Sequence, residues 1–330
     1  MDLTQPINVV AVNNTRVEYG NVLKSLNMFD VADILKDCTP MLGVKSSLVL
    51  GKTKHGTISK KYNGTFTGGT TVGTVVPRTL TVYPVVAEML DEPEKYRRMF
   101  FADVAGGLWN QAHPFELWLL QHGIKVAAEE LYSAIFTAKR SESAGATAVT
   151  DAFDGFFEII DADITSGLIS AANKNYYVNG AITRANAGEY LLDMWRSRHK
   201  TFRTKESIMW LPEDVADLYD DWYKDEHDAP PNVDVAGQSY LDGSNKRCRI
   251  KRFASAPEGS QRVILTFKEN MIYGTDKLED MKDMRAFESG NPYKFAAAMK
   301  YIFGTQFESV HEREFCVNDR SGAGSGSTSA

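Results

Sequence analysis

The feature that most constrains this chain is a basic segment rich in glycine and threonine. Residues 43–76 hold seven glycines and seven threonines, and they alternate with short apolar stretches such as residues 47–50. The pair Asn63-Gly64 is typical of the tight turn of a β-hairpin. The pattern predicts a long two-stranded hairpin, and an isolated hairpin is only marginally stable in water. The hairpin must therefore lie on another surface, and we expect adjacent copies of the chain to provide it.

Charge separates this segment from the rest of the chain. The net charge is −6, yet six basic residues and no acidic residue lie between Cys38 and Ala87. The remainder holds 31 basic against 43 acidic residues. The overall charge argues against a dedicated nucleic-acid binder, whereas the asymmetry favours contact between copies.

Two sets of side chains are candidates for that contact. Residues 213–228 hold eight acidic residues and one lysine, which indicates either a solvated helix face or a contact face for a basic partner. The candidate acidic residues are Asp217, Asp220 and Asp221. The candidate basic residues of the hairpin are Lys45, Lys52, Lys54, Lys60 and Lys61.

Length and composition are those of a folded protein with two or three substructures. The chain has 330 residues, of which 43 % are hydrophobic. No apolar run approaches the roughly 18 residues that cross a bilayer, so we expect no membrane contact. Residues 1–6 lack a basic region followed by an apolar one, and the three cysteines are far apart. We therefore expect neither a secretion signal nor a disulfide framework, and folding in a reducing cytoplasm.

Apolar periodicity predicts a mixture of helices and strands. The clearest element is a helix over 114–137, whose apolar residues recur at helical spacing. Further helices are expected over 29–36, 84–90 (ended by Pro93), 184–199 and 213–227. Strands are expected over 156–160, 207–211, 248–253, 263–267, 271–274, 304–307 and 314–318. Residues 293–303 fit a strand, whereas the run 295–302 within them fits a helix equally by its alanines. Residues 321–330 fit a disordered tail.

Motifs that would indicate catalysis or metal binding are incomplete. Gly51-Lys52-Thr53 ends like a phosphate-binding loop, but Ser46 stands where that loop needs a glycine. The segment 311–315 has Phe315 where a zinc-binding helix needs its second histidine. Asp161 and Asp163 fit turn residues better than a pair of acid/base groups. The basic strand 246–252 fits an exposed strand better than a face that contacts phosphates or an acidic neighbour. We therefore expect no enzyme activity, no cofactor and no metal.

The order of these elements resembles a known family. A hairpin, a long helix, a central α/β unit and terminal strands follow one another, as in the major capsid proteins of tailed bacteriophages with the Hong Kong 97 (HK97)-type fold. Four segments carry the resemblance: residues 153–160, which enter the central domain after Asp154-Gly155; 207–219, a strand followed by a helix; 267–276, which contains Asn270, Gly274 and Asp276; and 303–307. The resemblance extends to coats of phages that infect Bacteroidetes.

The resemblance implies an α+β fold with named parts. Residues 1–40 would be an N-terminal arm, 41–80 the extended E-loop hairpin, and 81–151 the P-domain with its spine helix over 114–137. Residues 152–292 would be the axial A-domain, 293–318 the returning strands of the P-domain, and 319–330 the tail.

The implied function is structural. Copies of the chain would assemble through pentamers and hexamers into the icosahedral shell that encloses phage double-stranded DNA. Expected partners are other copies, the portal, a separate scaffolding protein, decoration proteins and, non-specifically, packaged DNA; assembly would occur in the host cytoplasm. The alternatives are an encapsulin-type nanocompartment shell, with cargo inside, or an α/β enzyme with an unrecognised site.

Deleting residues 46–75 tests the sequence-based role of the hairpin. We expect the deletion variant to fold as a monomer and to form no shells, because the segment that bridges copies is missing. Electron microscopy of the purified variant is the measurement, and normal shells would contradict this role.

Overall fold

The computed structural model describes most of the chain and divides it into two compact units. The residues that it describes are 14, 17, 34–55, 61, 64, 73–107, 115–143, 145–228, 239–278, 280, 283–287 and 294–319. Unit 1 comprises residues 1–45, 82–158 and 273–304, and unit 2 comprises 46–81, 159–272 and 305–330. Among the described residues, no helix has the length and apolar character to span a membrane.

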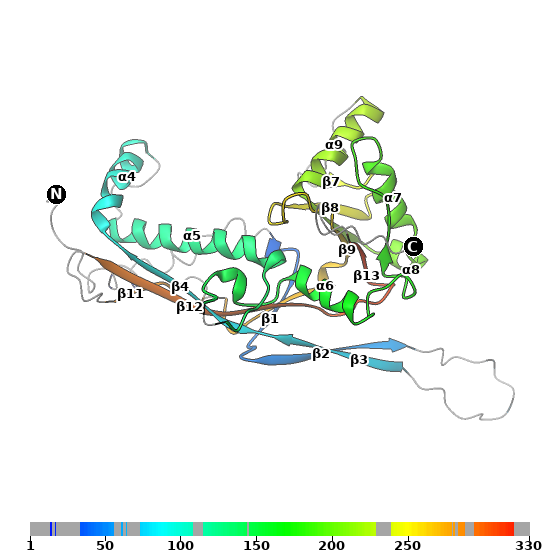
Figure 1. The fold of residues 1–330 in the computed structure, drawn as a ribbon, viewed down its shortest axis with the longest axis horizontal. Coiled ribbons are helices and arrows are strands. Elements are labelled where there is room, and N and C mark those ends of the chain that lie inside the picture. The colour runs from blue at the N-terminus through cyan, green and yellow to red at the C-terminus, as the bar shows by residue number, and fades with distance from the viewer. Residues whose placement is uncertain are drawn as a thin grey trace. The chain divides into compact units, whose positions relative to one another are not determined.

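Unit 1 is built around a long helix and a β-sheet. Helix α5 (Phe115–Thr137) matches the predicted helix, and Figure 1 shows it running along β4 (Tyr83–Asp91) and β12 (Phe295–Phe307). The sheet has the order β1 (Thr39–Leu42), β10 (Met271–Thr275), β12 and β11 (Arg285–Phe287), and β4 also pairs with β12. The predicted apolar face of α5 is buried throughout, at Leu117, Leu120, Ile124, Ala127, Leu131 and Ile135.

The expected helix over 84–90 is wrong. These residues form β4, which pairs antiparallel with β12 from Tyr83↔Phe303 to Asp91↔Phe295. Val85 is buried while the next residue, Val86, is half exposed, which is the alternation of a strand. Pro93 does not end a helix but begins one, α4 (Pro93–Ala105), because proline is tolerated in the first helical turn.

The expected strand over 156–160 is also wrong. Residues Phe156–Thr165 form helix α6, and the apolar run instead packs one helical face, with Phe156 and Phe157 beside Phe136 of α5. Gly155 sits so close to the end of α5 that a Cβ atom there would lie 2.8 Å from the Ile135 carbonyl oxygen.

Unit 2 contains a six-stranded mixed sheet with helices, as the alternating pattern predicts. Its order is β5 (Tyr176–Tyr177), β13 (Phe315–Asn318), β9 (Val263–Thr266), β6 (Ser207–Pro212), β8 (Cys248–Phe253) and β7 (Ser239–Tyr240). Strands β6 and β8 are parallel. The helices are α7 (Ala187–Arg196), α8 (Lys200–Arg203) and α9 (Glu213–His227), and two short 3-10 turns lie elsewhere in the chain, at Val149–Asp151 and Lys268–Asn270.

The remaining predicted elements have mixed outcomes. The alanine-rich run is a strand, since 295–303 lies within β12, and the expected strand 304–307 is its continuation. Of the helix expected over 29–36, only Ile34 and Leu35 are helical in the described part. The expected tail 321–330 lies outside the described residues. The hairpin is present as β2 (Ser47–His55) and β3 (Gly73–Thr81).

Gly155→Ala tests the close approach between the start of α6 and the end of α5. The added methyl group would meet backbone atoms, which cannot rotate away, so we expect a loss of about 1–3 kcal/mol in the free energy of unfolding. Chemical denaturation measures it. Gly145→Ala is the control, because a Cβ there has nothing within 4 Å; equal stability of the two variants would contradict the explanation.

Candidate functional site

The root of the hairpin is the candidate functional site, and its geometry begins with the ladder. Strands β2 and β3 pair antiparallel, with Leu48 opposite Leu80 and Leu50 opposite Arg78. Because side chains alternate along a strand, these four residues and Lys52 share one face. Leu80 is fully buried and Leu50 nearly so. Leu48 is partly exposed, so the buried part of this face is centred on Leu50 and Leu80.

Arg78 makes the first polar contact of this face. Its Nη1 and Nη2 atoms donate to the two carboxylate oxygens of Asp163 on α6, at 3.2 and 2.7 Å, and Nη2 also donates to the Gln306 side-chain oxygen at 2.8 Å. Only about a tenth of either ionic side chain is exposed. Removing one partner would leave the other buried without its counter-charge, which typically costs about 3–5 kcal/mol.

Lys52 makes the second polar contact. Its Nζ lies 3.0 Å from the Glu308 carboxylate and 2.8 Å from the Glu314 carboxylate. Burial alone would lower the pKa of Lys52, but the hydrogen bonds to Glu314 and Glu308 outweigh burial and raise it above its ordinary value. The ammonium therefore stays charged at neutral pH.

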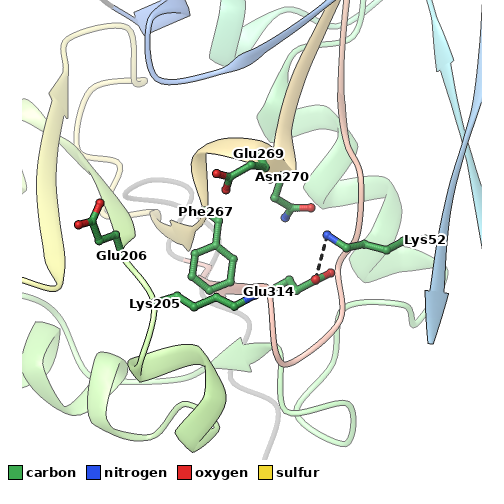
Figure 2. A pocket seen from close by; sticks show the side chains of 7 residues that line it. All are labelled: Lys52, Lys205, Glu206, Phe267, Glu269, Asn270 and Glu314. Atoms are coloured by element: carbon green, nitrogen blue, oxygen red, sulfur yellow. Dashed lines mark ion pairs between the residues drawn. The ribbon is translucent and has the colours of Figure 1, made fainter. Parts of the chain in front are cut away.

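A pocket of about 310 Å³ opens beside this contact. Figure 2 shows Lys52 reaching Glu314 there, with Lys205, Glu206, Phe267, Glu269 and Asn270 around it. Asn270 is committed to the fold: its amide nitrogen donates to Thr266 Oγ1 and to the Ser309 carbonyl, and its amide oxygen accepts from the Ser309 backbone N–H. Asn270 and the Lys52–Glu314 pair thus hold segments of unit 2 together at this pocket.

The described root of the hairpin corrects one expectation. We expected the hairpin to gain its stability from adjacent copies, but its described root is held by its own unit through the ion pairs of Arg78 and Lys52. Lys45 and Lys61 are exposed. The side chains of Lys54 and Lys60 lie outside the described residues. Contact of these lysines with a neighbouring copy stays a prediction.

The candidate acidic face on α9 is partly neutralised within unit 2. The Arg252 guanidinium of β8 contacts Asp220 and lies 3.3 Å from the Asp217 carboxylate and 3.5 Å from that of Glu213. Arg184 binds Asp225 through two nitrogens and lies 3.7 Å from the Asp221 carboxylate. These exposed pairs reduce the charge that α9 offers to a partner, and each contributes little to stability.

Residues that were candidates for phosphate binding or acid/base catalysis lie in regular secondary structure. Gly51 and Lys52 lie inside strand β2, so the phosphate-loop interpretation fails there. Asp161 and Asp163 lie on α6, where each pairs with an arginine: Asp161 with Arg262, and Asp163 with Arg78. Within the described residues, no group of three or more His, Cys, Asp or Glu side chains could hold a metal ion.

Comparison with known proteins finds solved structures that have a similar fold. No family model matches the sequence, and no curated protein matches it. A chain of the satellite phage P4 procapsid, determined with its size determination (Sid) protein, matches with a TM-score of 0.54 and 10 % identity, over 90 % of this chain and 97 % of that one. The capsid of an empty GTA particle matches with a TM-score of 0.54 and 12 % identity, over 89 % of this chain and 90 % of that one.

The capsid of the native GTA particle matches similarly, with a TM-score of 0.53, 12 % identity and coverage of 89 % and 97 %. The chain therefore has the mixed α/β fold of these phage and GTA capsid structures. None of the three supports a Bacteroidetes-infecting phage as its source.

Lys52→Gln tests the outer contact of the root. The pair is partly exposed, so we expect the free energy of unfolding at pH 7 to fall by about 1 kcal/mol or less. Because the folded-state pKa of Lys52 is raised, its stabilisation is fully present below the ordinary value of about 10.4 and is lost as the pH rises through the folded-state value.

Denaturant unfolding at pH 7 and at about pH 11 measures this difference. The exposed Lys45→Gln is the control and should change stability at neither pH. A Lys52→Gln effect that grows with pH would contradict the assignment.

Proposed function

We propose that this chain is the major capsid protein of a tailed phage or a related particle. Copies would assemble through pentamers and hexamers into an icosahedral shell around double-stranded DNA. One observation carries the proposal: the fold matches a phage procapsid chain and GTA capsid chains over about nine-tenths of this chain and at least as much of each of theirs. A match along the whole length of both chains supports the same use of the fold, where a match to one domain would not.

Each part of the fold is proposed to have its own role in assembly. The hairpin acts as the E-loop, α5 as the spine helix of the P-domain, and the sheet of unit 2 with α7 and α9 as the axial A-domain. Lys45, Lys54, Lys60 and Lys61 contact neighbouring copies, while Lys52 holds the root of the hairpin. The acidic side chains of α9 that Arg252 and Arg184 leave exposed meet basic neighbours around the axis.

The remaining assignments follow from this role. The site of action is the virion, after assembly in the host cytoplasm. The chain acts without catalysis, and its expected partners are other copies, a portal, scaffolding and decoration proteins, and the packaged DNA. The nanocompartment shell shares the layout, but the matched structures are a phage procapsid and GTA capsids, which favours a capsid.

Replacing residues 56–72 with a two-residue Asn-Gly turn tests the bridging role. This change keeps Leu50, Lys52 and Arg78, which the longer deletion of 46–75 would partly remove, so the variant should retain the stability of its own subunit. We expect a folded protein that forms no closed shells, because lysines 60 and 61 and the reach of the hairpin are lost.

Size-exclusion chromatography and negative-stain microscopy of the two proteins, prepared in parallel, measure the outcome. Gly145→Ala is the control and should assemble like the unaltered chain. Closed shells from the shortened protein would refute the bridging role, and failure of the unaltered chain to form shells would refute the capsid function.

A further inference from the structure

We infer that Asp163 and Gln306 are positioning residues for the hairpin, which act through Arg78. They fix the direction in which the β2–β3 ladder leaves its subunit and, through it, the curvature of the shell. The first part stands on the geometry of unit 2 alone; the second rests on the proposed capsid function.

Asp163 and Gln306 bind both the Arg78 side chain and the backbone of β3. Asp163 engages two nitrogens of the Arg78 guanidinium, and Gln306 accepts from one of them. The Gln306 side-chain nitrogen also donates to the carbonyl of Thr79, the next residue of β3, at 2.9 Å. A planar guanidinium held at two oxygens has one orientation, which an apolar contact would not impose.

A second contact prevents the ladder from pivoting on the first. Lys52 lies two residues beyond Leu50, the residue opposite Arg78, and binds Glu308 and Glu314 on the same face. Two contacts along a strand define a direction, whereas one contact defines only a point. From Leu50 to His55 the strand advances by roughly 17 Å at about 3.4 Å per residue, so a small rotation at Arg78 displaces its far end.

The burial of the ion pair favours a directional role over a stabilising one. Arg78 and Asp163 are both about nine-tenths buried, and the Arg78 Nε atom has no hydrogen-bond partner in the described structure. Desolvating such a pair offsets most of its attraction, so packed apolar side chains would hold the root at least as strongly. What the charged pair adds is a single geometry.

The chain offers a matched control on the same helix. Asp161 lies two residues before Asp163 on α6 and pairs with Arg262, which also binds Asp319. Asp163→Asn and Asp161→Asn therefore each remove one negative charge and replace one carboxylate oxygen by an amide nitrogen. Only the first weakens the hold on Arg78.

The first measurement needs no assembly. Spin labels at His55→Cys, on the described end of β2, and at the exposed Val178→Cys report the direction of the hairpin within unit 2 of the dissociated full-length chain. The native cysteines Cys38, Cys248 and Cys316 are buried. We expect Asp163→Asn to broaden the distance distribution at least twofold and Asp161→Asn to leave it unchanged.

Equal widths for the two variants would overturn the inference, whatever the chain assembles into. If Asp163→Asn does not fold by circular dichroism, Gln306→Ala replaces it, since that change removes the Thr79 contact and leaves the ion pair. An unchanged width in Gln306→Ala would then overturn the inference.

The second measurement addresses curvature. In shells imaged by electron microscopy, we expect the unaltered chain and Asp161→Asn to share one diameter, and Asp163→Asn to give a spread of diameters or open sheets. A single unaltered diameter for Asp163→Asn shells would overturn the link to curvature. Absence of shells from the unaltered chain would instead count against the proposed function and leave the spin-label result standing.

Discussion

A two-stranded ladder that cannot bury both of its faces is the constraint on which this structure depends. One face of β2–β3 carries Leu50, Leu80, Arg78 and Lys52. The two leucines are buried, and unit 2 supplies three carboxylates that pair with the two cations. The sequence of contacts runs from apolar at the root to charged further out. This order lets the hairpin be held firmly where water is excluded and remain polar where it extends away from its support.

Charge counted along a sequence overstates the charge that is available to a partner. Two of the six cations near the hairpin, Lys52 and Arg78, are neutralised within unit 2, and the acids of α9 face Arg252 and Arg184. The contrast in charge between the basic segment and the acidic remainder is therefore partly used up in ion pairs within the chain. What remains for contact between copies is the exposed set, and exposed pairs add specificity and association rate more than stability.

Patterns that depend on burial alone could be predicted from the sequence, and patterns that depend on distant partners could not. Helix α5 was predicted from its long and regular apolar spacing, strand β6 from a short apolar run, and helix α9 from Pro212 and the acidic residues of its first turn. Residues 84–90 are helix-like in composition, but pairing with β12, more than 200 residues later, makes them a strand. Phe156 to Ile160 has apolar residues that suit either structure, and in the helix that forms, Phe156 and Phe157 pack beside Phe136 of α5. The Arg78–Asp163 pair joins residues 85 positions apart, and no local signal marks it.

Sharing a fold at 10–12 % identity has a physical explanation that bears on the hairpin. A helix on a sheet needs only apolar side chains at the right spacing, so many sequences satisfy unit 1 and its buried α5. A directed contact is different, because a guanidinium fork must meet a carboxylate at a particular place and angle. Divergence can therefore exchange most core residues without altering the fold, whereas changing the residues at the root of the hairpin alters where the hairpin points. The geometry particular to this chain is for that reason set by a few polar contacts, and the general architecture by the many apolar ones.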